Sequence, residues 1–208
     1  MIDPKLSRRA LLQRAGLTGG ALFLSSAFPF PRAARAAAAS QTPVSLSEAE
    51  WKSLDAVTAR LIPTDHEPGA REAGCVNFID KALANEEAAA LPLYRGGLAA
   101  LAVCVQASEV PTFEALEPAA QDELLRSVEL GSATAWPAQA PPSPMFFEVV
   151  RAHTLIGFLA EPKYGGNGDF AGWRVAGYPG PRHVQGGYTP EQMNGTAPIR
   201  MPWDDETK

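Results

Sequence analysis

The tripeptide Asp65-His66-Glu67 combines side chains that bind metal ions, and it lies in a segment rich in turn-forming residues. Two carboxylates and an imidazole next to one another look like a metal-binding cluster in the linear sequence. Adjacent residues in a turn rarely converge on one ion, and no second histidine motif accompanies them. We therefore interpret the tripeptide as a solvated turn. An independent exported metal-dependent enzyme that uses Asp65, His66 and His153 stays as an alternative.

His153 lies on an apolar stripe at helical spacing, together with Phe146, Val149 and Ile156. In this position it could serve as a base or hydrogen-bond donor toward a partner, or it could be a satisfied residue of the core. No Gly-x-Ser-x-Gly, Ser-x-x-Lys or paired Cys and His offers a nucleophile that it could activate. We therefore predict no catalytic residue in this chain.

Residues 166–171, Gly-Asn-Gly-Asp-Phe-Ala, match the dinucleotide-binding pattern Gly-x-Gly-x-x-Ala. That pattern binds a pyrophosphate only where a strand precedes the glycines and a helix follows them. Here a helical pattern precedes the glycines, while Gly172, Gly177 and Pro179 argue against a helix after them. We therefore predict no nucleotide site, and neither a cofactor nor a metal in this chain.

The segment from His153 to Gly180 is rich in glycine and aromatic residues, and glycine supplies no side chain to bury. The segment must therefore pack on the chain's own helices or on another protein, where aromatic anchors are common. Its aromatic rings could also stack on a sugar, as in a periplasmic sugar-binding protein. The candidate contacts with a protein partner are His153, Tyr164, Gly165, Gly166, Asn167, Asp169, Trp173 and Tyr178.

Apolar residues recur at helical spacing in five stretches, and no stretch alternates as a half-buried strand does. The first stretch has the clearest start, because Ser47 and Glu50 form a capping box while Leu46 and Trp51 occupy the staple positions. The other helices are predicted to begin near residues 71, 92, 118 and 143. The predicted fold is all-α, a small body of about five helices followed by a long, irregular segment rich in glycine and aromatic residues.

Cys75 and Cys104 fall on the predicted second and third helices. In an oxidising compartment they could form a disulfide that closes a loop of about 30 residues. They could equally remain buried thiols that pack as small apolar residues. Spacing does not decide between these alternatives, because the geometry between two helices cannot be derived from it.

The chain carries its charge unevenly. Residues 1–40 contain six basic side chains and one acid, which leaves a formal charge of −10 on the remainder of a chain whose total is −5. An acidic body repels nucleic acid and anionic lipid, so neither is predicted as a partner.

The N-terminal segment has the features of an export signal. Ser7-Arg8-Arg9 followed by apolar residues is a twin-arginine pattern, and Ala34-Arg35-Ala36 fits a cleavage site. The apolar run between them would span about 21 Å as a helix, too short for a hydrocarbon core of roughly 30 Å. We predict a signal peptide at residues 1–39, a helical domain at residues 40–185 and a polar tail at residues 186–208. Export of a folded chain without a cofactor motif suggests that a partner carries the cofactor.

Three blocks of the sequence carry a family resemblance. The first runs from Leu61-Ile-Pro-Thr-Asp65 to Phe78-Ile-Asp80, and the second includes Phe147 and Val150-Arg151-x-His153-Thr. The third runs from Pro162-x-Tyr164-Gly-Gly-Asn167 to Tyr178-Pro-Gly180. Together with the arginine signal, these blocks resemble the gluconate 2-dehydrogenase subunit 3 family over most of residues 7–180.

The resemblance implies a small, non-catalytic subunit of a periplasmic or membrane-attached dehydrogenase. In that family the large partner is a flavoprotein dehydrogenase of the glucose–methanol–choline type, which carries FAD and acts on gluconate, other sugars or glucosides. A cytochrome c subunit with haem c often takes the electrons. The large subunit commonly lacks an export signal and crosses with the small one. By resemblance, this chain would be an export escort that the twin-arginine translocase recognises.

Overall fold

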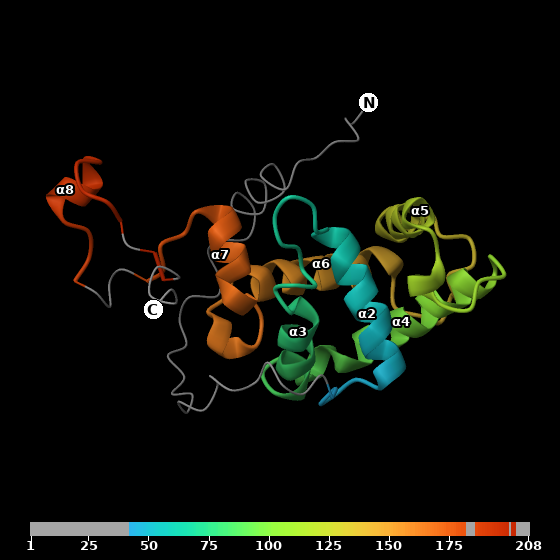
Figure 1. The fold of residues 1–208 in the computed structure, drawn as a ribbon. Helices are drawn as coiled ribbons and strands as arrows, with labels where there is room; N and C mark the ends of the chain where they lie inside the picture. Colours follow the sequence, from blue (N-terminus) through green and yellow to red (C-terminus); the bar gives the residue numbers. More distant parts are fainter. Residues whose placement is uncertain (1–41, 182–185, 200, 203–208) are drawn as a thin grey trace. The chain divides into compact units, whose positions relative to one another are not determined.

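The computed structural model describes residues 42–181, 186–199 and 201–202, and every regular element in these ranges is helical (Figure 1). The main helices are α2 (Glu48–Leu61), α3 (Cys75–Ala84), α4 (Leu91–Gln106), α5 (Pro118–Glu129) and α6 (Ser143–Leu159). The prediction of an all-α body with five helices is confirmed. The predicted export signal, with Arg8 and Arg9, lies outside the described residues.

Shorter helical elements connect and follow these helices. Two 3₁₀ turns, η2 (Ala88–Ala90) and η3 (Phe113–Ala115), precede α4 and α5. After α6 come the 3₁₀ turns η4 (Pro162–Tyr164) and η5 (Gly168–Phe170), and then the short helices α7 (Ala171–Ala176) and α8 (Pro190–Met193). The glycine-rich segment is therefore more helical than its composition predicts.

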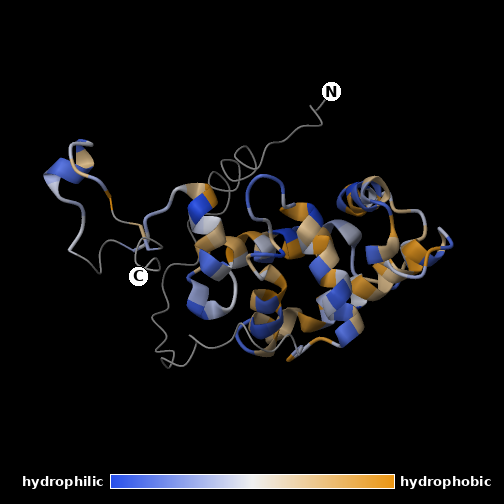
Figure 2. Ribbon diagram, viewed as in Figure 1, coloured by the Kyte–Doolittle hydropathy of each residue, from blue (hydrophilic) through white to orange (hydrophobic). Residues whose placement is uncertain are grey.

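Helix α6 is the centre of the body. It contacts α2, α3, α4, α5 and α7, and Figure 1 shows it crossing behind α2 and α3. Its buried side chains include Phe146, Val150 and Phe158. Hydrophobic residues gather where the helices meet, while the loop between α2 and α3 is mostly hydrophilic (Figure 2). Elements far apart in sequence are thus assembled on one apolar helix.

Local signals determine the start of α2 as predicted. The backbone N–H of Glu50 donates to Ser47 Oγ, and the Glu50 carboxylate accepts from the backbone N–H of Ser47 at 2.7 Å. This capping box satisfies two of the amides that a helix leaves without partners.

The predicted start of the second helix near residue 71 was wrong, because α3 begins at Cys75. Gly74 before it has φ of 68°, a left-handed conformation that favours glycine and interrupts a right-handed helix. The backbone N–H of Gly168, from the glycine-rich segment, donates to the carbonyl of Ala73 at 2.9 Å. A distant part of the chain therefore stabilises the turn that precedes α3, so that the helix begins at Cys75 and not near residue 71.

Helix α4 has an unusually apolar composition. The stretch Ala88–Gln106 is long and apolar enough to cross a membrane by those two criteria alone. Its inner face supplies Tyr94, Leu98, Leu101 and Val105 to the hydrophobic core. Burial of this face in the helical body explains why its residues are apolar.

Asp80 on α3 anchors the segment that leads into α2. Its carboxylate accepts hydrogen bonds from the backbone N–H groups of Val44, Ser45 and Leu46 at 2.6, 3.0 and 2.9 Å. The Ser45 hydroxyl also donates to it at 2.8 Å. We call this arrangement the Asp80 clasp. It gives a buried carboxylate the donors that it needs in place of water.

Candidate interaction surface

A short helix follows the glycines at residues 166–171, so the prediction that none would follow was wrong. Helix α7 begins at Ala171, and its first backbone N–H groups find an acceptor in the Asn167 side chain. Asn167 Oδ1 accepts from Gly172 N at 2.8 Å and from Trp173 N at 3.4 Å. The element before these glycines is helical in the described residues, so the strand that a dinucleotide fold requires does not precede them.

Asn167 joins the end of α6 to the start of α7. It is fully buried, and its Nδ2 donates to the carbonyl of Ala160 at 2.8 Å while its Oδ1 binds α7. Its φ of 49° lies in the left-handed region, which asparagine tolerates better than most residues. The amide therefore holds the segment on the chain's own helix.

Two glycines allow this segment to touch the backbone of α6. A Cβ atom at Gly166 would lie 2.2 Å from the carbonyl oxygen of Gly157, and one at Gly172 would lie 1.7 Å from that of Phe158. Neither position has room for a side chain, because such contacts are far below van der Waals separation. The glycines serve the close packing of the chain on itself.

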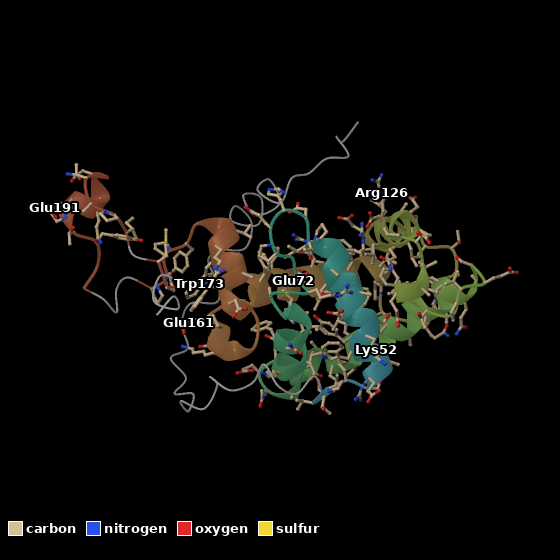
Figure 3. All side chains as sticks on the ribbon, in the orientation of Figure 1. Lys52, Glu72, Arg126, Glu161, Trp173 and Glu191 are labelled. Atoms are coloured by element: carbon tan, nitrogen blue, oxygen red, sulfur yellow. The ribbon has the colours of Figure 1, made fainter. Side chains whose placement is uncertain are left out.

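Trp173 is buried, with 5% of its surface exposed, and lies on α7 beside the end of α6 (Figure 3). Its indole N–H donates to the carbonyl of Leu159 at 2.7 Å. Its ring packs against Phe170, with ring centroids 5.5 Å apart, and forms a T-shaped pair with Tyr178, with centroids 5.0 Å apart. Because it is buried, Trp173 offers no free face for stacking on a sugar.

The candidate partner contacts thus fall into two groups. Gly166, Asn167 and Trp173 are buried among the chain's own helices. His153, Tyr164 and Gly165 are partly exposed, and Asp169 and Tyr178 are exposed. A partner that approaches the described body from solvent would reach the second group.

His153 is paired within the body. Its Nδ1 shares a hydrogen bond of 2.9 Å with the hydroxyl of Tyr94, and the two rings stack with centroids 5.9 Å apart. Burial lowers the pKa of His153, and the nearby Glu87 carboxylate partly opposes this shift. Burial also raises the pKa of the Tyr94 hydroxyl. His153 therefore provides a hydrogen-bond partner for the buried Tyr94 hydroxyl, which is a structural role.

The other candidate chemistry is not assembled into a site. His66 is solvent-exposed beside Asp65, and their side chains approach to 3.2 Å. Among the described residues, no group of three or more His, Cys, Asp or Glu side chains could hold a metal ion. The disulfide considered for Cys75 and Cys104 is not formed in the structure. Both thiols are free and buried, and burial raises the pKa of each.

The pairing of His153 predicts a pH dependence of stability. Because the folded-state pKa of His153 is lowered, the unfolded chain binds more protons in weak acid. The neutral histidine therefore stabilises the fold fully above about pH 6.5, the ordinary pKa of histidine. This stabilisation is lost as the pH falls below that value. His153→Gln should flatten the decline of unfolding free energy between pH 7 and 5 in urea titrations. A decline in the variant as steep as in the parent chain would show that His153 is not its source.

Asp80 and Glu72 are structural residues that the sequence reasoning missed. The Glu72 carboxylate accepts from Thr64 Oγ1 at 2.5 Å and from the backbone N–H of Gly69 at 2.9 Å. These hydrogen bonds lower the pKa of Glu72 and close the loop that contains the exposed Asp65 and His66. A carboxylate on the apolar face of α3 was the only sequence signal for Asp80.

The outward side of α6 is apolar as well. Five side chains at helical spacing form what we call the outer stripe: Met145, Val149, Ala152, Ile156 and Leu159. Met145, Ile156 and Leu159 are exposed and Ala152 is partly exposed, while the partly exposed Val149 also packs against the core. Spacings of three and four residues place all five on one side of a helix.

The family model of gluconate 2-dehydrogenase subunit 3 matches residues 48–180. The chain belongs to this family. The match begins with α2 and ends just after α7, so it spans the helical body and the glycine-rich segment. The resemblance of the three sequence blocks is thereby confirmed, and the family's name indicates a subunit of a multi-subunit gluconate dehydrogenase. Comparisons with curated proteins and with solved structures found no match.

Proposed function

We propose that this chain is the non-catalytic small subunit of an FAD-dependent dehydrogenase that oxidises gluconate, another sugar or a glucoside. Its large partner would be a flavoprotein of the glucose–methanol–choline type, which binds the FAD. A cytochrome c subunit would receive the electrons through haem c. The family match over residues 48–180 is the observation that carries this proposal.

The contacts within the body are consistent with a scaffold. The residues best suited to acid–base chemistry hold the fold together, since His153 pairs with Tyr94 and Asp80 binds the backbone before α2. The two thiols are buried and have raised pKa values, which suppress the reactive thiolate.

The second part of the proposal is an export role. The sequence Ser7-Arg8-Arg9 would direct the chain to the twin-arginine translocase, which moves folded proteins. The small subunit would bind the flavin-loaded partner in the cytoplasm, cross with it and remain attached in the periplasm. One signal would then serve two chains.

The export role is tested by replacing Arg8 and Arg9 with lysine while the flavoprotein is co-expressed. We expect periplasmic flavoprotein activity to fall at least tenfold, with the folded flavoprotein retained in the cytoplasm. The matched control replaces Arg14 and Arg32, outside both the arginine pair and the predicted cleavage site, with lysine and should leave export unchanged. Full periplasmic yield from the first variant would rule out the escort role.

A further inference from the structure

We propose that the flavoprotein subunit docks on the outer stripe of α6 and on the adjoining Tyr178. This inference rests on the proposed function and identifies the surface that would carry it. It also shifts the interface away from Gly166, Asn167 and Trp173, which are buried within the chain.

The outer stripe is apolar along the length of α6. The helix contains only two ionisable side chains besides His153, Glu148 and Arg151, and these pair with each other at 2.6 Å. A surface helix normally places polar residues on its solvent side, and a helix that is apolar all round is normally buried. The inner side of α6 is buried in the core, so the outer side is the part that still lacks a covering element among the described residues.

Exposed apolar residues also lie near both ends of α6. At its C-terminal end, the Leu159 carbonyl is bound by Trp173, and the exposed Tyr178 packs on that indole. At its N-terminal end, Gly131 lies against Pro144, next to the exposed Leu130. Of the nine exposed large hydrophobic residues in the described ranges, five lie on α6 or at these ends. A gathering of exposed apolar residues along and near one helix is typical of an interaction site.

Charge and size favour a different protein as the occupant. Residues 41–208 carry a formal charge of −10, so a second copy would bring an equally acidic body against the first. Anionic lipid would be repelled for the same reason. A 17-residue helix is about 25 Å long, and two such stripes alone would bury less than the roughly 1,000 Å² that a specific interface needs. A large partner can reach from Leu130 to Tyr178 and beyond the stripe.

Hydrogen bonds and ring contacts within the chain support this surface from beneath. Asn167 fixes the start of α7 to the end of α6, and the indole of Trp173 holds Leu159 and Tyr178 together. Preorganised apolar side chains lose little conformational freedom on binding, which favours affinity. The buried candidates therefore act on the interface by positioning exposed residues, without contacting the partner themselves.

The test measures binding of the full chain to a flavoprotein of the glucose–methanol–choline type, the partner named in the proposed function. Ile156→Arg adds a charge to the outer stripe, where Ile156 is 46% exposed. Val103→Arg adds the same charge to the outer face of α4, where Val103 is 43% exposed, and serves as the matched control. We expect Ile156→Arg to raise the Kd at least 30-fold, as at an interface hot spot, and Val103→Arg to change it less than threefold.

The outcomes separate this inference from the proposed function. Met145→Arg, nearer the other end of the stripe, is a second variant whose Kd is measured in the same way. Thermal melts check that each variant is folded. If the parent chain binds and both stripe variants bind equally well, the surface is wrong while the proposed function stands. If the parent chain does not bind the flavoprotein, the proposed function itself fails. A dimer, or binding to phosphatidylglycerol vesicles, that Ile156→Arg abolishes would assign the stripe to a second copy or a membrane and overturn the inference.

Discussion

Replacing Gly172 with alanine is expected to destabilise the helical body by about 3 kcal/mol or more. The new methyl group would lie 1.7 Å from the carbonyl oxygen of Phe158, and a backbone atom of α6 cannot move aside as a side chain can. Helix α7 would have to separate from α6, which would also weaken the hydrogen bond from the Trp173 indole to Leu159. Urea denaturation followed by circular dichroism measures the loss.

Gly177→Ala is the control for this prediction. Gly177 follows α7 with φ of 66°, so alanine costs backbone strain there, yet nothing lies within 4 Å of the added Cβ. We expect a loss of about 1 kcal/mol. Equal effects at the two glycines would show that α7 does not pack against α6 as closely as described.

Replacing Asp80 with alanine is expected to cost about 3 kcal/mol, because the donors of the Asp80 clasp lose their acceptor together. Asp80→Asn retains an oxygen acceptor and should lose less. Denaturant titration measures both. Asp122→Ala is the control, since Asp122 makes an exposed ion pair with Arg60 at 2.6 Å and should cost less than about 1 kcal/mol. An Asp80→Ala variant no weaker than the control would show that the clasp contributes little.

The same carboxylate gives stability an acid dependence. Burial alone would raise the pKa of Asp80, but the hydrogen bonds from Val44, Leu46 and Ser45 outweigh it, so the pKa is lowered. The unfolded chain therefore binds this proton first as the pH falls. The stabilisation by the Asp80 clasp is fully present above about pH 4, the ordinary pKa of aspartate, and is lost as the pH falls below that value. Asp80→Asn should remove this part of the acid dependence.

The parts of the fold that the sequence predicts are those with local causes. The capping box of α2 involves residues three positions apart, and apolar spacing identifies α4, α5 and α6 within a few residues. The start of α3 and the existence of α7 depend on contacts made across the fold. Gly168 binds the carbonyl of Ala73, and Asn167 supplies the acceptor for α7. No local pattern contains these contacts.

The candidate surface was only partly predictable for a related reason. Periodicity places Phe146 and Ile156 on one apolar stripe, yet Phe146 is buried and Ile156 is exposed. Because α6 is apolar around most of its circumference, hydrophobic spacing does not distinguish its inner side from its outer side. Among the aromatic candidates for a partner contact, Tyr178 is exposed and Trp173 is buried, a difference that aromatic type alone does not reveal.

During synthesis, the Asp80 clasp forms only after the segment that it anchors has been made. It joins residues 34 to 36 positions apart, so Val44, Ser45 and Leu46 leave the ribosome well before their acceptor does. Until α3 has formed, the segment ahead of α2 lacks this anchor and remains accessible to proteases. The chain length at which these residues become resistant to cleavage would therefore report when α3 has formed in a nascent chain.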